Sequence, residues 1–253
     1  MRPDRANPMW AIVEVIRVTM RQLLGRRRTV LLALLAFLPV LMAVVTRMFD
    51  EVEVQTFTDG IFEPLSMVIV LPLAAVLFGT GAFGAEIDEG TAVYLLSKPI
   101  SRWSLVLAKT LAAAILTLAL AVGSVLVAAL VDAATAPRGV TATEAYVAAT
   151  VAGALCYVAL FVALSIFTRR ALVIGIGYTL IWEGALSSLL AGIANLSVRQ
   201  YALGIADGFM QLGHDPAALS PATAATLSVV LVVVALVLAT WRLRRFELSG
   251  SGD

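Results

Sequence analysis

Six apolar runs, each close to the length of a membrane-crossing helix, constrain this chain more than any other feature of its sequence. A helix needs about 20 residues to cross the ~30 Å hydrocarbon core of a bilayer. Of the 253 residues, 60% are hydrophobic and only 14% are charged, which excludes an ordinary soluble globular protein. We therefore predict an all-α, polytopic membrane protein with six transmembrane helices, at about residues 29–48, 65–85, 105–131, 143–168, 171–194 and 223–241.

The basic residues predict the orientation of these spans. Lys and Arg near the ends of a span resist translocation, so they collect on the cytoplasmic side. With both termini in the cytoplasm, all but three of the 18 basic residues fall on that side, the exceptions being Arg47, Arg138 and Arg199. The first outer loop, FDEVEVQTFTDGIFE, is acidic. We expect the basic side to meet the headgroups of anionic membrane lipids and not a nucleic acid.

Residues 1–28 are predicted to form an interfacial helix ahead of the first span. Apolar residues recur at spacings of about three to four and polar residues collect on the other side, which is typical of a helix lying in the headgroup region. The apolar set is Trp10, Val13, Ile16, Met20, Leu23 and Leu24, and the polar set is Glu14, Arg17 and Arg21. Gly25 is expected to end this helix. The alternative is an ordinary basic anchor beside the membrane.

The whole chain, residues 1–253, is predicted to be a single transmembrane domain. No loop is long enough to bury a core of its own, and the longest, residues 195–222, would form at most a pair of short helices. The single cysteine, Cys156, falls in the fourth span and excludes an internal disulfide.

Nucleotide, metal and catalytic motifs are absent from this sequence or out of context in it. The stretch GTGAFG, Gly79 to Gly84, has the spacing of a dinucleotide-binding loop, but it closes an apolar span, so close helix packing is the better interpretation. There is no G-x-x-x-x-G-K-[S/T] phosphate-binding motif, and His214 has no second histidine or cysteine at ligand spacing. We expect no enzymatic activity, no metal site and no cofactor in this chain.

Glu183 is a candidate residue of a transport path, because it is a carboxyl deep inside the fifth span. At about 1.5 Å per residue it lies roughly 18 Å along a helix that starts near Ala171, beyond the bilayer midplane. No Lys or Arg is expected at that depth. Such an acid can face a cavity and act in function. The alternatives are a neutral acid hydrogen-bonded to a neighbouring helix, or a kink that lifts it into the outer interface.

Residues 86–104 form the least apolar long stretch in the middle of the chain and are predicted to be a cytoplasmic docking segment. Glu86, Asp88 and Glu89 suit the positive end of a short helix. That helix would continue until Pro99, which disfavours helical geometry at the residue before it. The alternative is a polar inner loop without a partner.

Apolar residues of the docking segment are expected to anchor its partner. Tyr94 and Leu95 share one helical face with Ile87 and Thr91, at spacings of three and four. Ser101 is expected to cap the third span.

The stretch EIDEGTAVYLLSKPISRWSLVLAK resembles the coupling-helix segment of type-2 ABC-transporter permeases, in which E-x-x-E-x-G-T is followed by apolar residues, a proline, a basic residue and G-K or A-K. The match is carried by Glu86, Glu89, Gly90, Thr91, Pro99, Arg102 and Lys109. Gly90 follows Glu89 directly, so the spacing is tighter by one residue. The N-terminal helix, the six spans and the passage from Trp182 to Gly208 are similar to the same family, so the resemblance covers nearly the whole chain.

The resemblance implies the membrane subunit of a bacterial ABC exporter, a permease in the cell (inner) membrane that forms the translocation path. It implies a second permease subunit, in a homodimer or heterodimer, and two copies of a separate ABC ATP-binding protein, which binds ATP and Mg²⁺ and docks on residues 86–104. Two other classes stay open. One is an ion-coupled secondary transporter, which would carry several ionisable residues within its spans; the other is an intramembrane enzyme or a non-transporting assembly or immunity protein.

Overall fold

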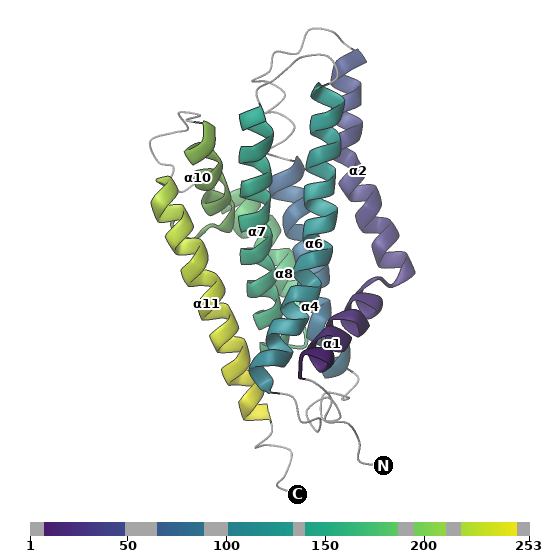
Figure 1. The fold of residues 1–253 in the computed structure, drawn as a ribbon, viewed down its shortest axis with the longest axis vertical. Helices are drawn as coiled ribbons and strands as arrows, with labels where there is room; N and C mark the ends of the chain where they lie inside the picture. The colour runs from purple at the N-terminus through teal and green to yellow at the C-terminus, as the bar shows by residue number, and fades with distance from the viewer. Residues whose placement is uncertain are drawn as a thin grey trace, which may run out of the picture.

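The computed structural model describes residues 8–48, 65–88, 101–133, 140–186, 195–210 and 219–246, and within these ranges every regular element is helical (Figure 1). The helices are α1 (Pro8–Leu23), α2 (Arg26–Met48), α4 (Leu71–Asp88), α6 (Arg102–Ala133), α7 (Val140–Phe167), α8 (Ala171–Gly177), the π-helical η2 (Tyr178–Leu186), α10 (Val198–Met210) and α11 (Pro221–Phe246). A further π-helical stretch, residues 65–70, leads into α4. The predicted all-α class is confirmed for the described residues.

Four helical stretches are long and apolar enough to cross a membrane: Leu65–Gly84, Arg102–Leu130, Thr143–Phe167 and Pro221–Arg245. They coincide with the second, third, fourth and sixth predicted spans. The first and fifth predicted spans coincide with shorter apolar helices, Thr29–Val45 and Ala171–Gly184, and the end of the fifth lies outside the described residues. Six crossings, with both termini in the cytoplasm, therefore stay a prediction.

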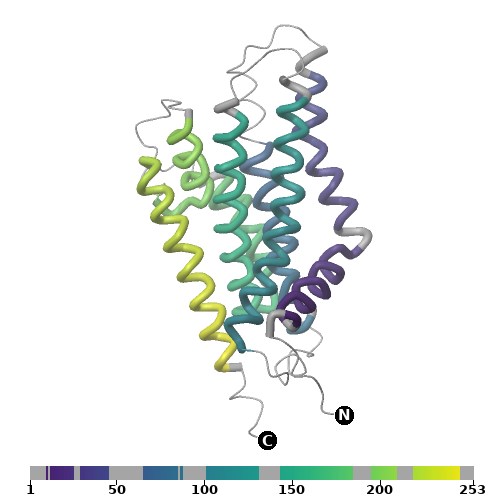
Figure 2. The backbone as a smooth tube through the Cα atoms, viewed as in Figure 1, coloured from purple at the N-terminus to yellow at the C-terminus, as the bar shows by residue number. Residues whose placement is uncertain are grey.

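Helix α7 is the central element of the bundle. It packs against α4, α6, α10 and α11, and Figures 1 and 2 show it between α11 and α6. Its Tyr157, Val158 and Phe161 side chains are at most 1% exposed. A helix that is apolar on all sides can be covered on all sides, and its small residues let neighbouring backbones approach closely.

Two of the three glycines of the GTGAFG stretch, Gly79 and Gly81, lie at such close approaches. A Cβ atom at Gly79 would lie 2.9 Å from Phe161 Cβ on α7, and one at Gly81 would lie 2.9 Å from Leu23 Cδ2 on α1. Carbon atoms in contact lie about 3.5–4.0 Å apart, so a larger residue would have to displace Phe161 Cβ at Gly79 or the end of the Leu23 side chain at Gly81. The interpretation of this stretch as a helix-packing sequence is confirmed.

Helix α1 packs at one end of the bundle, against α6 and α4. It ends at Leu23, and Gly25 separates it from α2, as predicted, but residues 26–28 belong to α2 and not to the interfacial helix. Leu23 is buried, whereas Trp10 and Val13 are 70% and 56% exposed. The attachment of α1 to a membrane surface stays a prediction.

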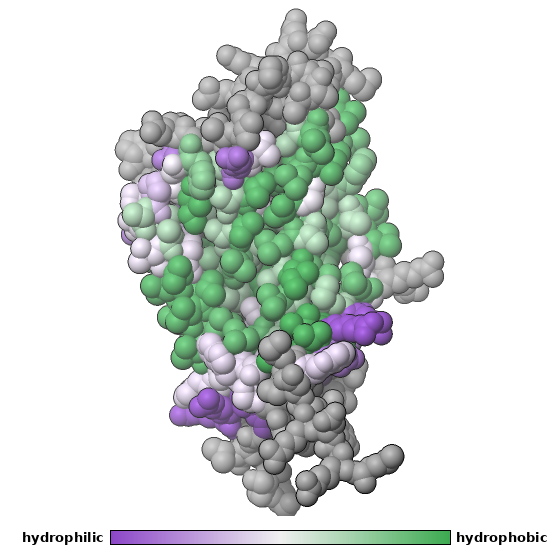
Figure 3. Space-filling view, viewed as in Figure 1, coloured by the Kyte–Doolittle hydropathy of each residue, from purple (hydrophilic) through white to green (hydrophobic). Residues whose placement is uncertain are grey.

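Figure 1 shows α1 lying obliquely at the end of the bundle where α6 begins and α11 ends. We call this the basic end, because Arg169, Arg170, Arg242, Arg244 and Arg245 lie at the helix ends gathered there. Figure 3 shows a broad apolar belt across the molecule with hydrophilic residues along its margins. The belt matches the surface that a bilayer's hydrocarbon core would cover.

Replacing Gly79 by alanine is expected to destabilise the protein by about 1–3 kcal/mol, the usual cost of overpacking a close contact. Gly123 is the matched control, because a Cβ there would have no described atom within 4 Å. Gly123→Ala should leave stability unchanged or raise it slightly. Thermal unfolding of both purified variants in detergent measures the difference, and equal effects would contradict the close approach of α4 to α7.

Candidate functional site

The docking segment, residues 86–104, joins α4 to α6, and the structure describes both of its ends. Its central residues Glu89, Gly90, Thr91, Tyr94, Leu95 and Pro99 lie outside the described residues, so their roles stay predictions. Helix α4 ends at Asp88 and α6 begins at Arg102. The backbone N–H of Ser104 donates to Ser101 Oγ at 3.1 Å, so Ser101 caps α6 as predicted.

A buried ion pair fastens the end of α4 to the first turns of α6. Lys109 Nζ lies 2.5 Å from Glu86 Oε1 and also donates to the carbonyl oxygen of Ala82. It lies 4.7 Å from the centre of the Phe83 ring, within the range of a cation–π contact. The Lys109 side chain is 2% exposed and that of Glu86 is 14% exposed. Both charges are therefore largely removed from water.

Because Lys109 is buried, its charge needs the partners that surround it. Removing a charge from water costs several kcal/mol unless the charge is paired and hydrogen-bonded. Ala82, Phe83 and Glu86 all belong to one stretch of α4, so the ammonium holds α6 against that stretch. The sequence places Glu86 and Lys109 in one motif but does not indicate that they pair. The feature of the sequence that could have indicated this pairing is a lysine inside an apolar span, because a buried lysine requires a partner nearby.

Glu183 lies in η2 and is fully buried. Both carboxyl oxygens accept hydrogen bonds. The donors are the hydroxyls of Tyr178 at 2.8 Å and Ser197 at 2.6 Å, and the backbone N–H groups of Val198 at 2.9 Å and Arg199 at 3.4 Å. The carboxyl is thus held by its own helix and by the beginning of α10.

These hydrogen bonds satisfy the N-terminus of α10. The first N–H groups of a helix have no partner within the helix, and this end carries the positive end of the helix dipole. A carboxyl group suits both conditions. Ser197 Oγ accepts a further bond from the N–H of Gln200 at 3.3 Å. Glu183 therefore joins α10 to η2, whose π-helical geometry occurs frequently at functional sites.

Two aromatic side chains support the same junction. Trp182 Nε1 donates to the carbonyl oxygen of Leu196 at 3.2 Å, and the Tyr201 hydroxyl donates to that of Asn195 at 2.6 Å. Burial raises the pKa of Tyr201 above its usual value, which keeps this hydroxyl protonated as a donor. Asn195 and Leu196, just before α10, are thereby held by hydrogen bonds from α10 and from η2.

The geometry agrees with one of the alternatives for Glu183, an acid hydrogen-bonded to a neighbouring helix. Arg199 contributes a backbone N–H, because residues 195–210 pack back against the bundle through α7 and α11. Of residues 195–222, in which we expect at most a pair of short helices, the structure describes α10, and residues 211–218 lie outside the described residues. Figure 1 shows α10 toward the end of the bundle opposite α1. A part for Glu183 in transport stays a prediction.

Candidate metal ligands do not gather in the part of the chain that the structure describes: no three His, Cys, Asp or Glu side chains there could hold a metal ion together. His214 lies outside that part.

Replacing Glu86 by alanine is expected to destabilise the protein by about 3–5 kcal/mol, because it leaves the buried ammonium of Lys109 without its anion. The double variant Glu86→Ala/Lys109→Met should be more stable than Glu86→Ala alone, since it removes the uncompensated charge as well. Glu144→Ala is the control: Glu144 is exposed on α7, and its loss should change stability by less than about 0.5 kcal/mol. Thermal unfolding in detergent gives all three values. A double variant no more stable than the single one would contradict the pairing.

Replacing Glu183 by alanine is expected to cost about 3 kcal/mol or more, because four donors lose one acceptor group and each buried unsatisfied group costs ~1–3 kcal/mol. Glu183→Gln keeps one acceptor oxygen and should be milder. Undocking of α10 can be followed by thiol labelling of Ala202→Cys in a Cys156→Ala background, since Ala202 is only 1% exposed. Equal labelling with and without Glu183→Ala would show that the carboxyl does not hold α10.

Comparison with protein families gives a match over most of the chain. Among curated proteins, none matches this sequence significantly. The family model described as "ABC-2 family transporter protein" matches residues 14–248, which include both the Glu86–Lys109 pair and the Glu183 junction. The matched range covers nearly the whole chain, and the apolar helices agree with a transmembrane component. The chain therefore belongs to the ABC-2 transporter family, and it is a membrane-embedded permease subunit of an ABC transporter.

Proposed function

We propose that this chain forms the translocation path of an ATP-driven exporter, and that separate subunits bind ATP and Mg²⁺ and hydrolyse the nucleotide. Membership of the ABC-2 family implies ATP-binding partners in general. The observation that carries the finer proposal is the Glu86–Lys109 pair, because it ties together the two helices between which the docking segment runs.

In the proposed mechanism, the partner docks on residues 86–104. The pair and the close packing of α4 on α6 make the two helices move as one unit when the segment is displaced. A rigid unit of this kind passes a displacement on, whereas two independently mobile helix ends would absorb it. Arg102, the first residue of α6, belongs to the same moving part.

The displacement continues through α7 to the opposite end of the bundle. Helix α4 packs against α7, and α7 packs against α10. Because Glu183 holds the beginning of α10 against η2, the junction opens or closes as these helices shift. We therefore assign the Glu183 junction to the transport path, as a gate remote from the ATP-binding partner.

The assembly we propose contains two permease subunits, identical or different, and two ATP-binding subunits. It lies in the bacterial inner membrane with the basic end toward the cytoplasm, as the sidedness of Lys and Arg favours. Apolar side chains that are exposed on α2 and α11, such as Leu31, Leu34 and Val229, face lipid or the second permease subunit.

Replacing Tyr94 and Leu95 together by alanine should weaken binding of the ATP-binding subunit by about 2 kcal/mol or more, the loss expected for apolar anchors of an interface. Asp88→Lys should act more mildly and with salt dependence, because rim charges are screened. Pull-down of the ATP-binding subunit from detergent extracts, with membrane insertion checked separately, measures both effects.

The control for this experiment is Glu144→Ala, which changes an exposed residue of α7 outside residues 86–104. It should leave partner binding unchanged. Full partner binding and full transport by Tyr94→Ala/Leu95→Ala would show that residues 86–104 are only a loop.

A further inference from the structure

A cavity of about 160 Å³ opens at the basic end, between α1, α4 and the turn that joins α7 to α8. An engineered cavity of about that size holds a benzene molecule, so the space suits a small chemical group more than a single water. Its lining comes from three separate parts of the chain, represented by Gln22, Gly84 and Arg169. Glu86, Lys109 and Glu183 do not line it, although Ile87 of the docking segment does.

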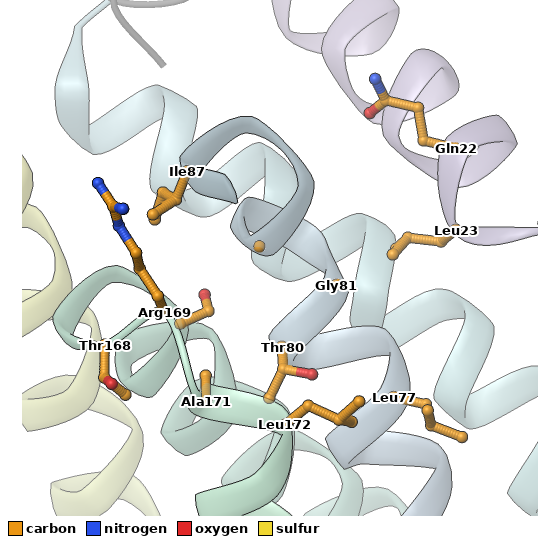
Figure 4. Close-up of a pocket in the computed structure, with 12 residues that line it drawn as sticks. Gln22, Leu23, Leu77, Thr80, Gly81, Ile87, Thr168, Arg169, Ala171 and Leu172 are labelled. Carbon is orange, nitrogen blue, oxygen red and sulfur yellow. The ribbon is translucent and has the colours of Figure 1, made fainter. Parts of the chain in front are cut away.

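The cavity is lined by both polar and apolar side chains. Figure 4 shows the Arg169 guanidinium beside Ile87, the Gln22 amide across the view from it, and Leu77 and Leu172 farther away, toward the opposite end. Among the lining residues there is no Asp or Glu. The cavity therefore offers a ligand the positive charge of Arg169 and, toward Leu77 and Leu172, apolar surface.

The hydroxyl groups of the lining are already engaged with the backbone. Thr80 Oγ1 donates to the Val76 carbonyl at 2.6 Å and Ser165 Oγ donates to the Val162 carbonyl at 2.7 Å. Thr168 Oγ1 accepts a bond from the N–H of Arg170 at 3.2 Å. Arg169, by contrast, is exposed and has no ion-pair partner among the described residues. Its guanidinium is the charged group that remains to recognise a ligand.

The apolar end continues onto the outside of the bundle. Leu172 is 37% exposed, and the next two residues of α8, Val173 and Ile174, are 69% and 48% exposed. Helix α8 starts beside Arg169 and runs away from the basic end, into the apolar belt. A ligand with its charge at Arg169 would thus find apolar surface in the direction in which lipid chains extend.

We propose that this cavity binds the phosphate-bearing headgroup of an anionic phospholipid, with an acyl chain along Leu172, Val173 and Ile174. A guanidinium matches phosphate oxygens with two parallel hydrogen bonds, and the apolar wall accommodates the glycerol and upper chain. The bound lipid contacts α1, α4 and α8 together. This site is more specific than the general attraction of a basic surface for anionic lipids, and it does not depend on the proposed coupling to ATP-binding subunits.

The cavity can be filled without disturbing the helix packing. A Cβ at Gly84 would meet no described atom within 4 Å, whereas one at Gly81 would collide with Leu23. Gly84→Leu should therefore occupy the ligand's space and leave α1 and α4 in place. Gly123→Leu is its matched control, because Gly123 also has open space around it and does not line the cavity.

The test is native mass spectrometry of the detergent-solubilised full chain, titrated with phosphatidylglycerol, phosphatidylcholine or inorganic phosphate. We expect one saturable phosphatidylglycerol per chain, at least tenfold weaker binding in Arg169→Gln, and loss of that site in Gly84→Leu. Arg170→Gln removes a neighbouring exposed arginine that does not line the cavity, so this variant and Gly123→Leu should bind within twofold of the parent chain.

Three results would overturn the proposal. Equal weakening by Arg169→Gln and Arg170→Gln would reduce the effect to general surface charge. Phosphatidylcholine binding as tightly as phosphatidylglycerol would exclude selection of an anionic headgroup, and inorganic phosphate competing at the same concentration would assign the site to free phosphate. Should Gly84→Leu fail to fold, the comparison of Arg169→Gln with Arg170→Gln decides the question alone.

Discussion

Inside a bilayer the backbone has no water to bind, and the structure of this protein depends on that constraint. Each unpaired N–H or C=O in hydrocarbon costs several kcal/mol, so a spanning segment must satisfy its own backbone, as a helix does. The described part of the chain is accordingly a helical bundle. Helix N-termini also need partners for their first N–H groups: the exposed Ser101 caps α6, and the buried Glu183 accepts from the first N–H groups of α10.

The same shortage of water explains where the buried polar side chains lie. Lys109 and Glu183 are two of the largest fully buried side chains, and each is surrounded by partners from a second helix or from the start of one. A charged or polar group costs too much to bury alone, so each becomes a fixed joint between elements. The Glu86–Lys109 pair lies where α4 enters the docking segment, and Glu183 lies at the beginning of α10. Together they mark the two places where the proposed mechanism needs helices to move as units.

Helix α7 packs against both α4 and α10 and so connects these two places, and small residues keep its packing close. Gly79 brings α4 against Phe161, and Gly153 brings α7 against Leu71. Close backbone approach increases dispersion contacts, which drive helix association when lipid and protein surfaces are equally apolar. A shift of α4 therefore has to move α7 or break these contacts. In the proposed mechanism, displacement passes through this packing, while hydrogen bonds hold the ends of the bundle.

The sequence by itself determined the features that depend on local chemistry. Apolar runs predicted the helices, Gly25 predicted the break after α1, and Ser101 predicted the cap of α6. GTGAFG predicted a packing surface. Each of these features follows from length, capping or residue size within a few neighbouring residues.

The tertiary structure alone decided which helices meet. Thr143–Phe167 and Pro221–Arg245 are similarly apolar, yet α7 is mostly buried and α11 mostly exposed. Likewise Glu86 with Lys109, and Glu183 with Ser197, are 23 and 14 residues apart in the chain. Pairing at such separations depends on how each helix is rotated and seated against its neighbours, and uniformly apolar helices leave no pattern in the sequence from which that rotation could be predicted.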